Sequence, residues 1–505
     1  MKVLLMHPDR DFNMQQALPW NVADLTKDLE LDVLLQAMAS GDLFLFEVSR
    51  VAFFSGLHTE PGTVLYRQQV VRDCLKNSEI VRHLYNLAVD TIEGTRKHGW
   101  GISSHYPSSM LYSAIELLER LLGSLRKIRS FASTYSGGFE SEAFTVFFSM
   151  LQKELAEDYL TKIEQHLTAL KFRQGVLLSA ELGEYNESTN YLLREVNDKE
   201  QHWLLRIFGN RTSPYTFYLD ERDEAGAQIV SEMRYRGISR VAVVLAQSAD
   251  QVLGFFKILR TELAFYVGCI NLHDRLMAKQ EPVCLPKPSP SNERNHKFTG
   301  LYDVCLSLQM SSRVVGNSSD FTGKNVVIIT GANQGGKSTF LRSLGLAQLM
   351  MQSGMFVGAE SFEAELCPAL FTHYKREEDP TMKFGKLDEE LARMSAIVDN
   401  IVPKAILLLN ESFAATNERE GSELANQIVT ALLEKQVRVL FVTHLYEFAG
   451  GFSEKKSDGA IFLRAERKED GSRTFRLLEA QPLETSYGED LYSQIFGSTD
   501  VVSHR

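Results

Sequence analysis

The sequence predicts a mixed fold: a mainly helical region over residues 1–282 with a small β-containing insertion near residues 175–237, then an α/β domain over residues 283–505 with a mostly parallel sheet. Three observations predict it. Apolar residues recur every three to four positions through much of the first half of the chain. The proline-rich segment Glu281–Asn295 then interrupts any helix. Beyond it, short β-branched runs alternate with helical stretches.

The overall charge of the chain is acidic. Its 505 residues carry a net charge of −11, and 44% hydrophobic with 24% charged residues is the composition of an ordinary globular protein. A chain of this length is expected to fold as about two to four units. Its overall field does not attract nucleic acid, so any binding to DNA would need a local basic patch or a geometry that encircles the duplex.

Five cysteines are scattered along the chain without a C-x-x-C pair. This odd, dispersed set argues against a disulfide framework and against a zinc site, and it fits a reducing compartment. The first residues contain too short an apolar run for a secretory signal, and no apolar run is expected to span a membrane. We therefore expect a cytoplasmic protein with no membrane partner.

Helical periodicity dominates the first half of the chain. The expected helices are Leu29–Ala39, Tyr66–Ile92, Ser109–Ser133 and Ser141–Phe172. In the last of these, apolar residues fall at steps of three and four and form one stripe. We expect it to be a single helix on the order of 45 Å long. A second long helix with its own apolar stripe is expected over roughly Ala246–Lys279.

A small β-containing insertion separates these two long helices. Short strand patterns occur at Gly175–Ala180 and Tyr191–Arg194 with a polar turn between them, and Thr216–Leu219 is a candidate third strand. The insertion is expected to extend from about residue 175 to residue 237. The alternative is a plain helical bundle that carries a hairpin, because aromatic stripes usually belong to a core.

After the proline-rich segment, three apolar runs fit buried strands: Val326–Ile329, Ile406–Leu409 and Val437–Val442. Helical stretches lie between them, and this alternation is typical of a parallel sheet covered by helices. A final pair of runs, Ala460–Arg464 and Thr474–Leu478, flanks a turn with an Asp-Gly pair and predicts an antiparallel hairpin.

A glycine-rich turn after the first of these strands carries the most specific chemical signal. It fits the pattern G-x-x-x-x-G-K-[ST], and its residues are Gly331, Ala332, Asn333, Gln334, Gly335, Gly336, Lys337, Ser338 and Thr339. Glycines let backbone N–H groups approach a polyphosphate, and the N-terminus of the next helix adds unpaired donors. The lysine would reach the terminal phosphates and the serine hydroxyl would ligate Mg²⁺. We therefore predict binding of a nucleoside triphosphate; the alternative is a glycine-rich turn with a chance lysine.

Hydrolysis needs further groups at the same edge of the sheet. The second strand of this region is followed by Asn410 and Glu411, and a carboxylate at that point could hold the Mg²⁺ hydration shell or position water. The third strand is followed by His444, which lies where a γ-phosphate sensor would lie in this architecture. The alternative for His444 is a core histidine with satisfied hydrogen bonds.

The segment from about Val283 to Gly497 resembles the ATPase domain of the MutS mismatch-repair family. Residues 330–339 resemble that family's T-G-P-N-M-G-G-K-S-T, Phe441–His444 resembles its A-T-H strand end, and Ser486-Tyr487-Gly488 resembles its late S-Y-G. The resemblance implies an ABC-like P-loop ATPase domain with ATP and Mg²⁺ as ligands. Residues 1–282, with two long helices around a small β module, resemble the family's core, lever and clamp regions by architecture.

The resemblance also implies roles for individual residues. Lys337 would neutralise phosphate charge, Glu411 would orient the attacking water and His444 would sense the γ-phosphate. Asn410 stands where the family usually has aspartate. It would contact Mg²⁺ through water without supplying a negative charge, so we expect weaker Mg²⁺ affinity and slower turnover.

Two further departures from the family concern its dimer and its ends. The family's G-R-G-T-S-T segment, which reaches the partner's nucleotide across a dimer, is here Phe413–Glu418. Asn417 could substitute for the family's serine because it too can donate a hydrogen bond. The chain begins in lever-like sequence, so the amino-terminal mismatch-reading domain is expected to be absent and the carboxy-terminal dimerisation element to be missing or short.

These features lead to one expected function and two alternatives. The expected function is a DNA-binding ATPase, a homodimer that sandwiches ATP and whose nucleotide state switches a clamp on duplex or branched DNA. The first alternative is a clamp or adaptor that binds ATP without hydrolysing it, which Asn410 and the altered dimer segment favour. The second is an ATP-switched module that binds protein and not DNA, which the acidic net charge favours.

Overall fold

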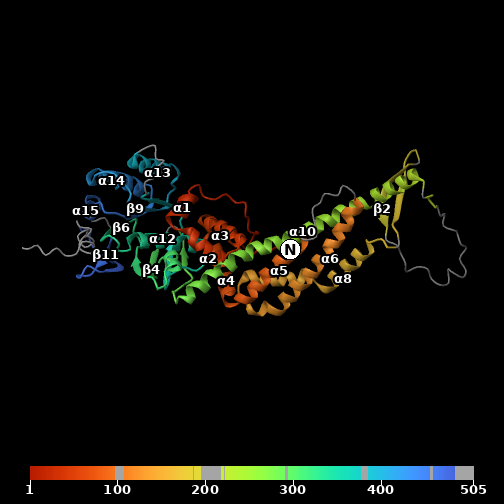
Figure 1. Ribbon diagram of the computed structural model, residues 1–505, viewed down its shortest axis with the longest axis horizontal. Helices are drawn as coiled ribbons and strands as arrows, with labels where there is room; N and C mark the ends of the chain where they lie inside the picture. The colour runs from red at the N-terminus through yellow and green to blue at the C-terminus, as the bar shows by residue number, and fades with distance from the viewer. Residues whose placement is uncertain are drawn as a thin grey trace, which may run out of the picture. The chain divides into compact units, whose positions relative to one another are not determined.

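The computed structural model describes residues 1–96, 107–173, 175–185, 187–194, 218–220, 222–290, 294–376, 385–454 and 459–483. The chain forms two compact units (Figure 1). The helical unit comprises Met1–Val3, Arg82–Gly137 and Thr145–Arg260, and the sheet unit comprises Leu4–Val81, Gly138–Phe144 and Thr261–Arg505. The boundary between residues 282 and 283 that the sequence suggests stays a prediction.

The described helices are α1 (Val22–Asp28), α2 (Leu31–Ala39), α3 (Leu43–Ser55), α4 (Pro61–Lys76), α5 (Ser78–Arg96), α6 (Pro107–Tyr135), α7 (Glu142–Glu154), α8 (Glu157–Ala169), α10 (Glu224–Ala278), α11 (Val304–Gln309), α12 (Lys337–Gln352), α13 (Lys386–Asn400), α14 (Glu418–Glu434) and α15 (Tyr446–Glu454), with 3-10 turns η1 (Gly56–His58) and η2 (Ser136–Gly138). The described strands are β1 (Leu177–Leu182), β2 (Ser188–Arg194), β3 (Lys287–Ser289), β4 (His296–Leu301), β5 (Asn317–Asp320), β6 (Val326–Gly331), β7 (Ser361–Glu365), β8 (Leu370–Tyr374), β9 (Ile406–Asn410), β10 (Arg438–Val442), β11 (Ala460–Arg467) and β12 (Arg473–Glu479).

The helical unit is built on aromatic and leucine-rich helix faces. One face of α6 is buried along its length, from Leu111 to Phe131. Phe147 of α7 stacks on Phe255 of α10 with ring centroids 6.4 Å apart. Phe147 and Phe255 are buried, so these two aromatic residues of the stripes are core positions, whereas Tyr159 is exposed. Strands β1 and β2 lie at the two strand patterns of the sequence and pair as an antiparallel hairpin, with Leu178 opposite Leu193.

The expected single helix over Ser141–Phe172 is wrong. The chain forms α7 and α8 instead, and Ala156 between them has a non-helical backbone with a φ of −55° and a ψ of 141°. The charges on either side suit two helix ends: Lys153 lies in the last turn of α7 and Glu157 in the first turn of α8. Each charge has the sign that the adjacent helix dipole favours.

The expected helix over Tyr66–Ile92 is also divided, into α4 and α5. Asn77 follows the last residue of α4, and its amide donates hydrogen bonds to the carbonyl of Asp73 at 3.0 Å and to that of Gly138 at 2.9 Å. Asparagine competes for backbone groups in this way more readily than it continues a helix.

Helix α10 begins earlier than the sequence indicated. It starts at Glu224, not near Ala246, because the carboxylate of Asp223 accepts a hydrogen bond from the N–H of Gly226 at 2.9 Å, which is an N-cap. Residues 224–237 of the expected insertion are therefore helical, and the bounds of the insertion stay a prediction. Of the expected third strand, residues 216 and 217 lie outside the described residues, and Tyr218 and Leu219 are not in a strand.

A mostly parallel six-stranded sheet forms the centre of the sheet unit, with strand order β12-β11-β6-β10-β9-β8. All neighbouring strands are parallel except β11 and β12, which form the expected hairpin. Val442 pairs with Asn410 on one side and with Ile329 on the other. The carboxyl ends of β6, β9 and β10 therefore meet at one edge of the sheet, where ligands bind in open α/β sheets.

Alternation along the strands determines which helices cover which face. Leu407 and Leu409 belong to a core with residues of α13, α14 and α15. The side chain between them, Leu408, lies instead against Gly345 of α12: a Cβ added there would come within 2.8 Å of Leu408. Side chains of period two point to opposite faces of a sheet, so α12 covers the face opposite the other three helices.

A second sheet, which the sequence did not predict, has the order β3-β7-β4-β5. Its edge strand β3 lies within the proline-rich segment and pairs with β7 alone. Pro288 sits in β3, which is consistent with the restriction of proline to edge strands.

The first residues of the sheet unit are bound to the buried carboxylate of Glu262 on α10. This carboxylate accepts hydrogen bonds from the N–H groups of Leu5 at 2.6 Å, Met6 at 3.1 Å and Phe12 at 2.7 Å. Further along, the Asn21 amide donates to the carbonyl of Leu370 in the edge strand β8 at 2.9 Å. The N-terminal segment is thus part of the sheet unit despite its distance in sequence.

Helix α10 also corrects the expectation about membrane-length segments. It is the described helix that is long and apolar enough, by length and composition, to cross a membrane. Only 33% of the apolar window in α10 is buried inside the structure, and one helix of this kind is weak evidence for a membrane span, because the core helix of a water-soluble protein and a signal sequence meet the same criterion. The finding therefore does not identify a membrane span.

Candidate functional site

The glycine-rich turn joins the buried strand β6 to helix α12, as its sequence predicts. Gly331 has a φ of 105° and Gly336 a φ of 86°, conformations that favour glycine. A Cβ at Gly331 would lie 2.9 Å from the backbone nitrogen of Ala465, and one at Gly335 would lie 2.7 Å from the Ala465 side chain. These glycines let the turn pack closely against Ala465 of β11. The last residues of the turn lead directly into the first turn of α12.

Lys337, the first residue of α12, is only 5% exposed. Its ammonium group donates hydrogen bonds to the carbonyls of Gly331 at 2.9 Å and Ala332 at 3.0 Å, so it lies inside the turn. Burial lowers the pKa of Lys337 to about 8; nearby Glu411 acts in the opposite direction. A triphosphate in the turn would supply the negative charge that this lysine lacks.

Ser338 follows directly and connects the turn to the neighbouring strand end. Its hydroxyl donates a hydrogen bond to Oδ1 of Asn410 at 2.9 Å. From the sequence, we expect Ser338 to ligate Mg²⁺ and Asn410 to contact it through water, although the two residues are far apart in the chain. The fold brings them into contact. Hydroxyl and amide oxygens, with the carboxylate of Glu411 next in sequence, are the oxygen donors that suit Mg²⁺ and its bound waters.

Glu411 and His444 form a hydrogen-bonded pair. Nε2 of His444 lies 3.1 Å from Oε1 of Glu411. The backbone of Glu411 has a φ of 55°, rare for a residue with a side chain, and its N–H donates to the carbonyl of Val442 at 2.8 Å. The hydrogen bond from His444 holds the pKa of Glu411 below its usual value, so the group is a carboxylate at neutral pH.

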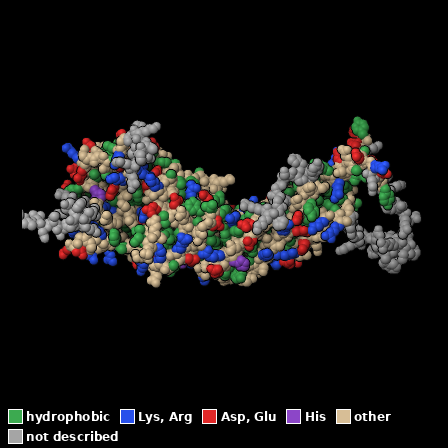
Figure 2. Space-filling model, in the orientation of Figure 1, with side chains coloured by type: hydrophobic (Ala, Val, Ile, Leu, Met, Phe, Trp, Pro, Cys, Tyr) green, Lys and Arg blue, Asp and Glu red, His purple; other side chains and the backbone are tan. Residues whose placement is uncertain are grey.

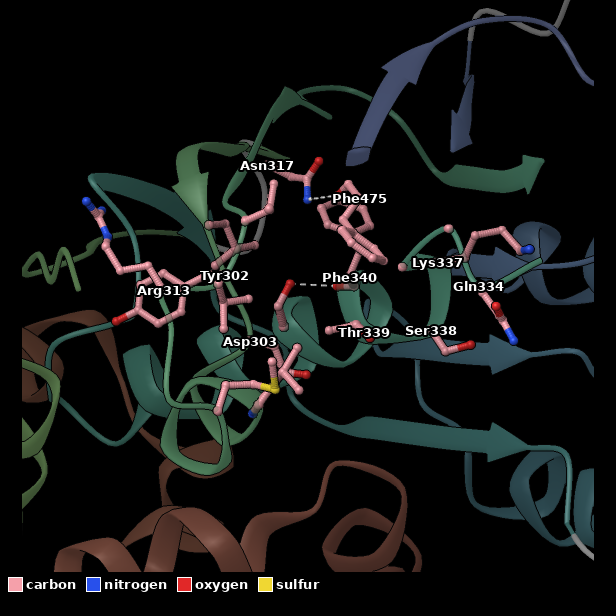
Figure 3. Close-up of a pocket in the computed structure, with 18 of the residues that line it drawn as sticks. Tyr302, Asp303, Arg313, Asn317, Gln334, Lys337, Ser338, Thr339, Phe340 and Phe475 are labelled. Atoms are coloured by element: carbon pink, nitrogen blue, oxygen red, sulfur yellow. Dashed lines mark hydrogen bonds between the residues drawn. The ribbon is translucent and has the colours of Figure 1, made fainter. Parts of the chain in front are cut away.

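A cavity of about 470 Å³ opens beside the glycine-rich turn. Figure 3 shows Gln334, Lys337 and Ser338 on one side of it and Tyr302 and Arg313 on the other. The cavity is lined by Leu301, Tyr302, Asp303, Leu306, Met310, Ser312, Arg313, Val314, Val315, Asn317, Asn333, Gln334, Gly335, Gly336, Lys337, Ser338, Thr339, Phe340, Ser343, Glu411 and Phe475. Its size is within the usual range for small-molecule sites.

Several lining residues carry no motif and were missed by the sequence analysis. Asp303 caps α11 by accepting from the N–H of Leu306 at 3.0 Å and pairs with Arg342 of α12 at 2.5 Å. Asn317 ties β5 to the hairpin by donating to the carbonyl of Phe475 at 3.2 Å (Figure 3). An Asp before an apolar run is a recognisable cap signal, but nothing in sequence spacing indicates that these segments border one cavity.

The segment expected to act across a dimer is engaged within its own chain. Oδ1 of Asn417 accepts a hydrogen bond from the N–H of Glu420 at 3.0 Å and so caps helix α14. The Thr416 hydroxyl donates to the Glu420 carboxylate at 2.5 Å. The amide N–H₂ of Asn417 is not part of this cap and can still serve as a donor. The Ser486-Tyr487-Gly488 motif lies outside the described residues.

Across the described residues there is no group of three or more His, Cys, Asp or Glu side chains that could hold a metal ion by themselves. Ser338, Asn410 and Glu411 offer a hydroxyl, an amide and a carboxylate oxygen, which are the donor types that Mg²⁺ and its bound waters take in proteins.

Comparison with protein families gives two matches. Residues 59–279 match the family model described as the MutS2 N-terminal domain, and residues 327–504 match the model described as MutS domain V. The first lies over helices α4 to α10, and the second begins within β6 and contains the glycine-rich turn, Glu411 and His444.

Comparison with curated proteins finds related sequences. The chain is 30% identical over 148 residues to the mouse protein "MutS protein homolog 4", covering 29% of this chain and 15% of that relative. It is 29% identical over 186 residues to "DNA mismatch repair protein MutS" of Clostridium kluyveri, covering 36% of this chain and 21% of the relative. For the protein of the same name from Prochlorococcus marinus the values are 24% over 260 residues, 50% and 28%. The matched regions are thus less than a third of each relative's length.

Proposed function

The chain belongs to the MutS family, and on that premise we propose that it is an ATP-binding, DNA-associated ATPase. In this proposal two copies enclose ATP, and the bound nucleotide changes the grip of the protein on duplex or branched DNA. The observation that carries the proposal is the meeting of Lys337, Ser338, Asn410 and Glu411 at one edge of the sheet, beside a cavity of nucleotide size.

ATP with Mg²⁺ is the ligand that these groups fit. Lys337 would exchange its two carbonyl partners for phosphate oxygens, and Ser338 would contribute its hydroxyl to Mg²⁺. Asn410 would hold a metal-bound water through its amide oxygen. The metal, when bound, would neutralise charge on the phosphates, while the chain's own residues orient the triphosphate and restrict water.

Hydrolysis in this proposal depends on Glu411 and His444. Glu411 is a carboxylate held in place by its strained backbone and by His444, so it can accept a hydrogen bond from an attacking water. His444, which pairs with Glu411, would turn one ring nitrogen towards the γ-phosphate. The catalytic groups would then be Lys337, Glu411 and His444.

A second function is favoured by two observations: an ATP-switched clamp or adaptor that does not hydrolyse its nucleotide. Asn410 provides no negative charge where the metal would sit, and its Oδ1 already accepts the Ser338 hydroxyl. Asn417 is used as a helix cap within its own chain. The first feature would weaken the chemistry without removing nucleotide binding, and the second leaves only the N–H₂ group of Asn417 for a role across a dimer.

DNA as partner is proposed from the family relationship and not from a strong basic surface. On the face shown in Figure 2, Lys and Arg side chains are interspersed with Asp and Glu, in keeping with the net charge of −11. Arg234 and Arg240 are exposed near the N-terminal end of α10 and could contact phosphates. If DNA is bound through its phosphates, the logarithm of the association constant should fall linearly with the logarithm of the salt concentration. An association constant that does not change with salt would favour a protein partner.

Calorimetric titration with ATP and Mg²⁺ tests the nucleotide site. The wild type is expected to bind, and Lys337→Ala is expected to lose at least about tenfold in affinity, since it removes the charge inside the turn. Lys297→Ala is the matched control. Lys297 is exposed on β4, does not line the cavity, and its Nζ lies 3.7 Å from Oδ2 of Asp320. Equal affinity in wild type and Lys337→Ala would overturn the site assignment.

A further inference from the structure

The C-terminal end of helix α10 has a fixed geometry. Gln280 has a φ of 57°, its N–H donates to the carbonyl of Met277 at 2.9 Å, and the N–H of Glu281 donates to the carbonyl of Leu276 at 3.1 Å. This pair of hydrogen bonds is the Schellman motif. The last turn of α10 therefore fixes the backbone of Lys279 and Glu281, and with it the direction of their side chains.

Lys279 holds the end of the short helix α11. Its ammonium group donates to three carbonyls, those of Ser307, Leu308 at 3.2 Å and Met310 at 2.7 Å. A cation at the C-terminus of a helix satisfies carbonyls that lack partners and is favoured by the helix dipole. Lys279 therefore stabilises the C-terminal end of α11.

Glu281 holds the next residues of the same loop. It is 2% exposed, and its Oε1 accepts from the Ser307 hydroxyl at 3.1 Å and from the N–H of Val314 at 2.9 Å. Its Oε2 lies 3.7 Å from Nε of Arg313. A buried carboxylate is stable only when it is paired and hydrogen-bonded, so the loop and the carboxylate stabilise each other.

The loop held in this way is a wall of the candidate nucleotide cavity. Met310, Arg313, Val314 and Val315 line it, together with the residues of the glycine-rich turn. In Figure 3, Arg313 lies across the cavity from Lys337 and Ser338. A triphosphate bound at the turn would leave the remainder of the nucleotide facing this wall, which we name the base-side loop (residues 310–315).

We propose that Lys279 and Glu281 are positioning residues: they hold the base-side loop against the nucleoside part of the ligand and thereby tie nucleotide occupancy to the end of helix α10. This inference rests on the proposed function, since it concerns the same cavity. It predicts that the two residues matter for the nucleoside part of ATP and not for its phosphates.

Two ligands separate these contributions: ATP, and inorganic tripolyphosphate, which can occupy only the phosphate end. Calorimetry with each, in the presence of Mg²⁺, would compare the wild type with Lys279→Met, Glu281→Ala and Glu281→Gln. Lys279→Met and Glu281→Ala are expected to weaken ATP about tenfold and to leave tripolyphosphate within about twofold of wild type. Glu281→Gln keeps an acceptor oxygen for the N–H of Val314 and is expected to lose less than Glu281→Ala.

Amide hydrogen exchange supplies a second readout. On addition of ATP, protection is expected to increase in residues 307–315 and in the last turns of α10, and this change should be lost in Glu281→Ala. Lys297→Met, which changes an exposed lysine outside the cavity, is the control and should behave as wild type.

Three results would overturn this inference. Wild-type ATP affinity in both Lys279→Met and Glu281→Ala would overturn the inference while leaving the proposed function intact. Equal loss of ATP and tripolyphosphate would show a general effect on the fold and would also overturn it. A wild-type protein that binds neither ligand would overturn the proposed function and this inference with it.

Discussion

The hydroxyl of Ser338 donates a 2.9 Å hydrogen bond to Oδ1 of Asn410, so the first turn of α12 and the carboxyl end of β9 are joined where Mg²⁺ would bind. An amide oxygen can accept this bond and orient a metal-bound water, but it leaves the metal's charge without the offset that a carboxylate provides. The weaker Mg²⁺ binding that we propose is therefore traced to the contact between the Ser338 hydroxyl and the Asn410 amide oxygen.

Replacing this amide by a carboxylate is expected to strengthen Mg²⁺ binding. In Asn410→Asp, the Mg²⁺ concentration that gives half-maximal ATP hydrolysis should fall by about tenfold, because a negative charge then lies beside the metal. Steady-state hydrolysis measured over a magnesium titration checks this. Asn325→Asp, a similar change just before β6 and outside the cavity, should have no effect; an unchanged magnesium requirement in Asn410→Asp would contradict the metal assignment.

Nucleotide affinity is expected to depend on pH through Lys337. Burial lowers the pKa of this lysine to about 8, and a bound triphosphate favours the charged form. Above pH 8, binding must therefore draw a proton onto the lysine, and the ATP dissociation constant should rise by up to about tenfold per pH unit.

Calorimetry at pH 7.5 and 9.5, in buffers of different ionisation enthalpy, measures both the affinity and the proton uptake. Lys297→Met should show the same pH profile as wild type, because Lys297 is exposed and outside the cavity. A constant affinity across this range, with no proton uptake, would show that Lys337 does not meet the phosphates.

Stability is expected to fall on acidification because two histidines are buried without charge. Burial lowers the pKa of His296 to about 3 and that of His373 to about 4. Both values lie below the 6.5 of an unfolded chain, so between pH 6.5 and these values the unfolded state binds more protons. The free energy of unfolding should then drop as pH falls, by up to about 1.4 kcal/mol per pH unit for each histidine.

Urea unfolding at pH 7.0, 6.0 and 5.0 measures this slope. The ring of His373 contacts the Ser412 hydroxyl at 2.7 Å and the carbonyl of Glu390 at 3.0 Å. In His373→Gln, the change in unfolding free energy per pH unit should be smaller by up to about 1.4 kcal/mol, the contribution of one proton, even if the variant is less stable overall. A slope identical to that of wild type would mean that His373 is not the titrating group.

Asn417 allows the cap of α14 to be separated from a role across a dimer. Asn417→Ala removes the acceptor for the N–H of Glu420 and should cost about 1 kcal/mol of unfolding free energy. Asn417→Asp keeps the acceptor and should retain wild-type stability, but it lacks the amide donor. If Asn417 contacts the partner's nucleotide, Asn417→Asp should lose ATP-dependent dimerisation in analytical ultracentrifugation; full dimerisation in this variant would restrict Asn417 to capping.

Local patterns in the sequence were sufficient for the glycine-rich turn and its strands. The run Val326–Ile329 predicts a buried strand, and the doubled glycine before Lys337 predicts a turn that opens a helix; both are present. The positions of Asn410, Glu411 and His444 followed from one rule, that parallel strands end at a common edge. The assignment of these residues to nucleotide chemistry stays a prediction.

Other features depend on contacts that sequence spacing does not reveal. The break at Ala156 interrupts a continuous apolar stripe, and periodicity alone does not detect the change of backbone conformation there. The early start of α10 depends on the cap at Asp223. Tyr302, Arg313 and Phe475 reach the cavity from segments that are widely separated in the chain, so no motif joins them. In the sequence, Lys279 is the expected end of a helix and Glu281 the first residue of the proline-rich segment, and only the fold shows that both hold the loop beside the glycine-rich turn.

Steady-state ATP hydrolysis, with and without duplex DNA at several salt concentrations, tests the central claim most directly. Wild type would be measured beside Lys337→Ala, Glu411→Ala and the control Lys297→Ala. The proposed function predicts a Mg²⁺-dependent rate that DNA changes and that Lys337→Ala and Glu411→Ala lose. A wild-type rate no higher than that of these two variants, despite measurable ATP binding, would contradict the ATPase assignment and establish the non-hydrolysing clamp or adaptor in its place.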